Sequence, residues 1–208
     1  MKCPLPCVVL LALSSASGAF AGLLYDNTTT DTGNTLLYSA GAYTGIGDQI
    51  HLVAPGNAVS ALLQMWNDGA AGTFDVALRV YQVGAPVGAQ VGGTFTLTNV
   101  ASTGKDIINL DFALGGLALP QDVIFIATVG NATGDMDLGL NMFEPPTLGS
   151  SDNTFLIVGD ASGFSQAASA SENVFFQLSD SAAPEPSTFT LLGAALAVAG
   201  LWRSRRAR

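Results

Sequence analysis

The middle of the chain alternates apolar and polar residues with the two-residue period of a β-strand. Segment 73–84 shows this pattern best. One face would carry Phe74, Val76, Leu78 and Val80, and the other Asp75, Ala77, Arg79 and Tyr81. A strand with one apolar and one polar face is typical of an antiparallel sheet that covers a core on one side.

Other segments with strand character follow at similar spacing, and turn sequences such as Asn67-Asp68-Gly69 separate them. They are residues 49–54, 59–66, 93–100, 106–113, 123–130, 138–143, 153–159 and 173–179. Residues 123–126 are apolar on both faces, so we expect that strand to be central. Segment 161–172 is rich in Ala, Ser and Gly, and we expect a flexible loop there. The pattern predicts an all-β fold, an antiparallel β-sandwich that is jelly-roll-like, with a short hydrophobic helix at each terminus.

The N-terminal 21 residues have the three parts of a secretory signal peptide. Lys2 supplies a positive charge, Val8 to Leu13 form an apolar run, and Ala19-Phe20-Ala21 is an A-x-A exit. The apolar run is too short for a membrane span, so we expect cleavage by signal peptidase after Ala21. Both cysteines lie in this segment, and the mature protein would therefore have no thiol and no disulfide.

The C-terminus begins with Pro184-Glu185-Pro186, whose prolines favour an extended, accessible backbone. Residues 187–202 then form an uncharged apolar helix of about 24 Å. This length is slightly short of a hydrocarbon core of about 30 Å. A basic cluster closes the chain and would hold it on the cytoplasmic side of a membrane: Arg203, Arg205, Arg206 and Arg208.

This series of three parts, over residues 184–208, resembles the PEP-CTERM sorting signal. The resemblance implies recognition by an exosortase, an integral membrane protease, in a bacterium that makes extracellular polysaccharide. It also implies a transient membrane anchor and final delivery to the cell surface or extracellular matrix. The chain would then divide into a signal peptide (1–21), a β-sandwich domain (22–178), a linker (179–183) and the sorting signal (184–208).

The body also has a weaker family resemblance. Its sequences Leu24-Tyr25-Asp26-Asn27, 45–50 and 73–76 are similar to the opening of uncharacterised exported domains of the choice-anchor type. That resemblance supports the sandwich and implies no activity.

The segment between the two ends is strongly acidic. Residues 22–183 hold fifteen acidic and two basic residues, and therefore a formal charge of −13. Such a surface repels phosphate backbones, so nucleic acid is excluded as a partner. The charge is typical of a soluble exported protein, and it also suits one that collects divalent cations.

Catalytic residues are scarce in the body. His51 is its only histidine, and alternation places it opposite Ile50 and Leu52, as a solvated strand residue. No G-x-S-x-G sequence accompanies a serine nucleophile. Glycoside hydrolysis needs two opposed carboxylates, but the spacing selects no pair among Glu144, Glu172, Asp75, Asp111 and Asp137. We therefore predict no catalytic residues, and a secreted hydrolase is the least favoured function.

Two binding sites are kept as hypotheses. Asp135 and Asp137 lie two residues apart beside Asn131, and such oxygens could bind calcium, although the full EF-hand loop is lacking. Trp66, the only tryptophan of the body, could stack on a glycan. Because Leu62 shares its parity, a core position is the stronger expectation for Trp66. The sequence predicts a non-catalytic surface or matrix protein that needs no cofactor, with a glycan- or calcium-binding module as the alternative.

Overall fold

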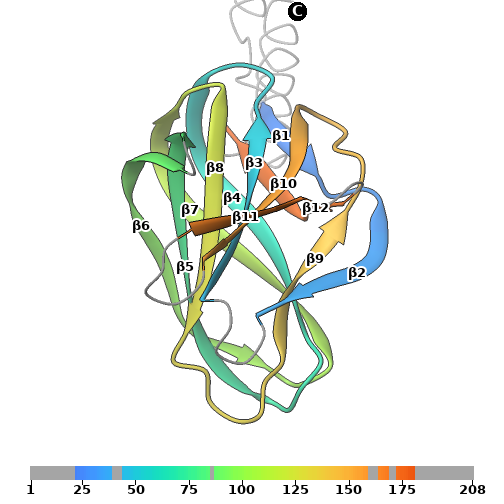
Figure 1. Cartoon of the computed structure of the whole chain (residues 1–208). Coiled ribbons are helices and arrows are strands. Elements are labelled where there is room, and N and C mark those ends of the chain that lie inside the picture. The colour runs from blue at the N-terminus through green and yellow to red at the C-terminus, as the bar shows by residue number, and fades with distance from the viewer. Residues whose placement is uncertain (1–21, 39–43, 85–86, 159–163, 169–171, 181–208) are drawn as a thin grey trace, which may run out of the picture. The chain divides into compact units, whose positions relative to one another are not determined.

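The computed structural model describes residues 22–38, 44–84, 87–158, 164–168 and 172–180 (Figure 1). Residues Leu23–Ser181 form one compact unit, which contains every described strand. The predicted signal peptide, the sorting signal and both terminal helices lie outside the described residues. Over the described ranges, the structure contains no helix with the length and apolarity needed to cross a membrane.

One sheet has six antiparallel strands in the order β11-β10-β3-β8-β5-β6. Its strands are β3 (Gly45–His51), β5 (Gly72–Val83), β6 (Val87–Ser102), β8 (Asp122–Gly130), β10 (Ser150–Val158) and β11 (Phe164–Ala168). Strand β8 lies between β3 and β5, and residues 123–126 are buried on both faces, as predicted.

The other sheet has seven strands: β1 (Leu23–Asn27), β2 (Asp31–Leu37), β4 (Gly56–Asn67), β7 (Asp106–Leu119), β9 (Leu138–Phe143), β12 (Asn173–Val174) and β13 (Phe176–Ser179). Strand β4 organises it. One side of β4 pairs with β7 from Gly56 to Asn67. The other side pairs with β13 through residues 60–63 and with β9 through residues 65–67. Strand β2 then pairs with β9, so β2, β9, β4 and β7 lie side by side.

The two sheets enclose one hydrophobic core. Phe74, Val76, Leu78 and Val80 of β5 are buried in it, as their alternation predicted. Phe125 of β8 stacks on Phe176 of β13, with ring centroids 3.8 Å apart, and so joins one sheet to the other. Each fully buried side chain of this size contributes about 1.5–3 kcal/mol. The predicted antiparallel all-β sandwich is confirmed, and its jelly-roll form stays a prediction.

The strand prediction was incomplete at three elements. Strand β11 lies inside segment 161–172, where a loop was predicted, and that prediction is wrong for residues 164–168. These residues pair with β10 from Val158 to Thr154, through backbone groups that every non-proline residue carries. Composition therefore did not reveal the strand. Strands β1 and β2 were also not predicted from the sequence.

Candidate functional site

Trp66 lies on the outer face of the seven-stranded sheet. In β4 the side chains of Ala61, Leu63 and Met65 point into the core, while Leu62 and Trp66 have the opposite parity and are half-buried. The expectation of a core position for Trp66 is therefore wrong. Leu62 and Leu63 are adjacent apolar residues, so alternation within β4 alone did not decide which face is buried.

Trp66 has an apolar partner on the same outer face. Its cross-strand partner in β7 is Ile107, whose side chain is 55% exposed. On the other side Trp66 pairs with Gly139 of β9, where a Cβ atom would come within 2.5 Å of the Thr35 side chain. The glycine lets β2 pack closely against β9 beside the indole. Trp66 and Ile107 thus form an apolar strip that remains accessible on the sheet surface.

A shallow cavity of about 320 Å³ opens next to this strip. It is lined by Asp31, Gly33, Asn34, Thr35, Trp66, Ile107 and Asn141. A register shift in β2 between Asp31 and Thr35 shapes one wall. Gly33 adopts a φ of 75° there, and its N–H donates to Oδ1 of Asp31 at 2.8 Å. The bulge thereby places the Asp31 carboxylate at the cavity wall.

A row of polar side chains crosses four strands beside the strip. The Thr35 hydroxyl donates to Oδ1 of Asn141 at 3.1 Å, and Nδ2 of Asn141 donates to Oε1 of Gln64 at 2.8 Å. Nε2 of Gln64 donates to Oδ1 of Asn109 at 3.1 Å. We call Thr35, Asn141, Gln64 and Asn109 the amide row. Each hydrogen bond fixes the next amide, so the row presents donors and acceptors in set orientations.

Acidic groups accompany the cavity. Asp31 is exposed, and Glu172 accepts a hydrogen bond from the side chain of Asn34. The described residues that line the cavity include no lysine, arginine or histidine. An apolar strip, a row of amides and a carboxylate are the groups that bind a pyranose ring, because its C–H face stacks on an aromatic ring and its hydroxyls need hydrogen-bond partners.

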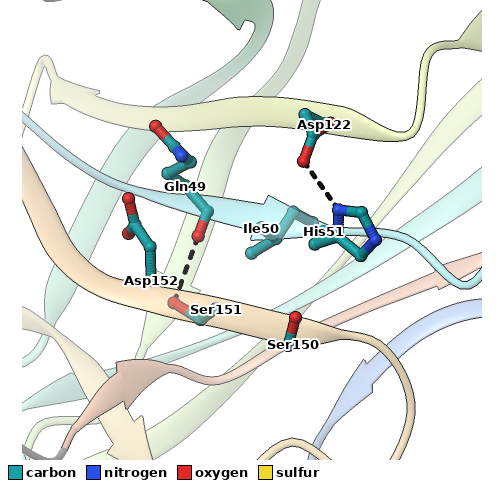
Figure 2. A pocket seen from close by; sticks show the side chains of 7 residues that line it. All are labelled: Gln49, Ile50, His51, Asp122, Ser150, Ser151 and Asp152. Atoms are coloured by element: carbon teal, nitrogen blue, oxygen red, sulfur yellow. Dashed lines mark hydrogen bonds and ion pairs between the residues drawn. The ribbon is translucent and has the colours of Figure 1, made fainter.

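A second cavity of about 280 Å³ contains His51 (Figure 2). Nδ1 of His51 lies 2.7 Å from Oδ1 of Asp122, and its Nε2 lies 3.0 Å from Nε2 of Gln121. His51 is exposed at the end of β3, as its position in the pattern predicted. Ser150 and Ser151 line the same cavity, and the Ser151 hydroxyl donates to Oδ1 of Asp48 and to the Gln49 carbonyl, both at 3.1 Å.

The proposed calcium ligands lie in the connection between β8 and β9. The carbonyls of Asp135 and Asp137 accept hydrogen bonds from the N–H groups of Ala70 and Asp68, at 2.7 and 2.9 Å. Nδ2 of Asn131 donates to Asp75 at 2.6 Å. Among the described residues, no group of three or more His, Cys, Asp or Glu side chains is arranged to hold a metal ion. Calcium binding at Asp135 and Asp137 stays a prediction.

Most residues of the cavity were not identified from the sequence. Asn141 of the cavity and Gln64 of the amide row carried a signal, because each is a polar residue inside an apolar strand segment. Thr35 and Asn141 are 106 positions apart, and only the pairing of β2 with β9 brings them together.

Comparison with known proteins identifies the C-terminal tail. Residues 182–206 match the PEP-CTERM protein-sorting motif. The chain is an antiparallel β-sandwich protein with a C-terminal sorting signal. The PEP-CTERM sorting signal predicted from the sequence is thereby confirmed. This motif implies export, a membrane-anchored intermediate, processing by an exosortase-type membrane protease and delivery to the surface.

The body has distant structural neighbours. One is CBM28, a carbohydrate-binding module specific for non-crystalline cellulose, with 10% identity, a TM-score of 0.32 and coverage of 57% of this chain and 72% of that one. Another is from infectious bursal disease virus, Gx strain, with 13% identity, a TM-score of 0.29 and coverage of 85% and 46%. At these TM-scores neither likeness bears on function. No curated protein matches the chain, and the resemblance to choice-anchor-type domains stays a prediction.

Proposed function

We propose that this protein is a non-catalytic surface or matrix protein whose sandwich binds extracellular polysaccharide on the outer face of the seven-stranded sheet. The observation that carries the proposal is the position of Trp66, which lies on that face beside the amide row and lines the cavity. A single half-buried tryptophan on a sheet surface needs no ligand to explain it. A tryptophan beside an ordered row of amides and a carboxylate has the composition of a sugar site.

The shape of the site suits a polymer. The cavity is shallow and lies on an exposed sheet face, so the interior units of a long chain could bind without a free end. The sorting route supports the same reading, because the PEP-CTERM resemblance implies a bacterium that makes extracellular polysaccharide. Binding to that polymer would hold the body at the surface after its membrane anchor is removed.

The test is glycan binding by the mature protein and by its Trp66→Ala variant. We expect the variant to bind about tenfold more weakly or worse, a loss of about 1.4 kcal/mol or more, because the stacking surface is removed. Calorimetric titration with polysaccharide from the producing cells measures this change.

Leu62→Ala is the matched control, since Leu62 is half-buried on the same face of β4 but does not line the cavity. It should leave affinity unchanged. A flat titration of the wild-type protein against both neutral and acidic glycans would overturn the proposed function, as would equal affinity of the Trp66→Ala variant.

A further inference from the structure

Among the described residues, the charged side chains that line the Trp66 cavity or bond to its lining are carboxylates. Asp31 lines the cavity, and Glu172 binds Asn34, which lines it as well. Asp111 is exposed on the same face of β7 as Ile107 and Asn109, two residues along the strand from Asn109 at the end of the amide row. A ligand seated on this face therefore lies among negative charges.

The basic residues of the body lie elsewhere. Residues 22–183 contain only Arg79 and Lys105. Arg79 belongs to β5 of the other sheet, where its Nε donates to Thr94 of β6 at 3.2 Å. Lys105 lies in the β6–β7 turn, with Nζ 3.6 Å from Asp68. Neither residue lines the cavity, so the carboxylate of a uronic acid would meet no compensating charge there.

The amide row also sets a direction and a length. Its four residues come from neighbouring strands, and Thr35 and Asn109 stand directly opposite their partners Asn141 and Gln64. Neighbouring strands are about 4.8 Å apart, so the row extends for about 14 Å across the sheet. The strand spacing is close to the length of one pyranose unit in an extended glycan. A glycan that lies along the amide row would thus place about one sugar unit over each space between neighbouring strands.

We propose that the site takes a run of about three uncharged pyranose units, laid across the strands β2, β9, β4 and β7, and that it discriminates against polyuronates. This inference rests on the proposed function and adds the class of glycan and the size of the site. Trp66 and Ile107 provide the apolar surface, the amide row binds hydroxyls, and Asp31 accepts hydroxyl hydrogens where it would repel a carboxylate.

The experiment compares neutral and acidic oligosaccharides of equal length on the full mature protein. Cello-, manno- and xylo-oligosaccharides serve as neutral probes, and oligogalacturonates and oligoalginates as acidic ones. We expect the best neutral series to bind at least about tenfold more tightly than either acidic series at low salt. This difference in affinity should become smaller at high salt, because salt screens exposed charges. Affinity should rise with length up to about three units and then stay constant.

Asp31→Asn is the matched variant, since its amide oxygen can still accept the Gly33 N–H. At low salt this variant should reduce the difference in affinity between neutral and acidic oligosaccharides, while the neutral oligosaccharides still bind. Acidic probes that bind as tightly as neutral ones would overturn this inference and leave the proposed function standing. If affinity stops rising at one sugar unit, or continues to rise well beyond three, the proposed site size of about three units is wrong. If no probe of either kind binds, the proposed function fails and the inference fails with it.

Discussion

Asp48 is a buried carboxyl group in the middle of β3. The Ser151 hydroxyl donates to its Oδ1 at 3.1 Å, and the Val174 N–H donates to its Oδ2 at 3.4 Å. Burial nevertheless raises the pKa of Asp48 from its usual 3.8 to about 8, because the two hydrogen bonds offset only part of the loss of solvation. In the folded protein this side chain is therefore mostly protonated at pH 7.

A raised pKa makes the free energy of unfolding depend on pH. Below about pH 4 Asp48 is protonated in both states. As the pH rises toward 8, the unfolded state releases its proton while the folded state keeps it, so the contribution of Asp48 to stability is progressively lost. We expect Asp48→Asn to flatten the decline in stability between about pH 4 and pH 8. Urea unfolding at several pH values measures this slope.

Asp75→Asn is the control for that prediction. Asp75 is exposed, and hydrogen bonds from the Asn131 side chain and the Asn99 N–H lower its pKa. Its contribution is present at neutral pH and is lost only as the pH falls below about 4, so this variant should keep the wild-type slope between pH 5 and 8. An unchanged slope in Asp48→Asn would show that other groups cause the pH dependence.

Trp66 shows how far residue-scale prediction could reach. The sequence placed Trp66 in a predicted strand and kept glycan stacking on its ring as one hypothesis. The face of β4 on which Trp66 lies depends on its register with β7, whose own core residues include Ile108 and Leu110. That register joins residues some forty positions apart, so it could not be read from a local pattern. The stronger sequence expectation, a core position, was wrong for this reason.

At the scale of elements, one side chain joins three connections between strands. Asn67, at the end of β4, is fully buried. Its Nδ2 donates to the Ala70 carbonyl and to the Ser102 hydroxyl, both at 2.8 Å. Its Oδ1 accepts the N–H groups of Gly69 at 2.9 Å and Asp137 at 3.1 Å. These partners belong to the β4–β5 turn, the end of β6 and the segment before β9.

We expect Asn67→Ala to destabilise the sandwich by about 2–4 kcal/mol, because it leaves several buried donors and acceptors unsatisfied. The denaturant midpoint measures the loss. Asn57→Ala, at an exposed position of the same strand, should change stability by less than about 0.5 kcal/mol. A loss below about 1 kcal/mol at Asn67 would mean that the three connections are held by their backbone hydrogen bonds alone.

Strands with a regular alternation were predicted well, and those without it were not. Strand β5 is buried on one face at every second residue from Phe74 to Val80, and its position followed directly from the sequence. Strand β2 reads Asp-Thr-Gly-Asn-Thr-Leu-Leu and contains a register shift, so no period-2 pattern exists to detect. The candidate site depends on β2 for Asp31 and Thr35, and it was therefore missed together with that strand.

At the scale of the whole molecule, the described strands of the sandwich end before the sorting motif begins. The last strand, β13, ends at Ser179 and is paired with both β1 and β4. The matched motif starts at residue 182. No described strand draws on residues of the motif, so removal of the tail takes no strand from either sheet. We therefore expect the body to stay folded when the tail is removed.

This organisation predicts the ends of the mature protein. Mass spectrometry of the surface or medium fraction should find a start at Gly22 and the loss of the hydrophobic segment 187–202.

Replacement of Pro184, Glu185 and Pro186 by alanine should leave a membrane-bound protein that still ends at Arg208, because the apolar helix and the arginines remain as an anchor. Because no described strand uses the tail, we expect this retained variant, extracted in detergent, to unfold at the same denaturant midpoint as the released wild-type protein. Wild-type protein at the surface with an intact tail to Arg208 would overturn the processing prediction. A lower midpoint for the released form would instead show that the tail contributes to the fold.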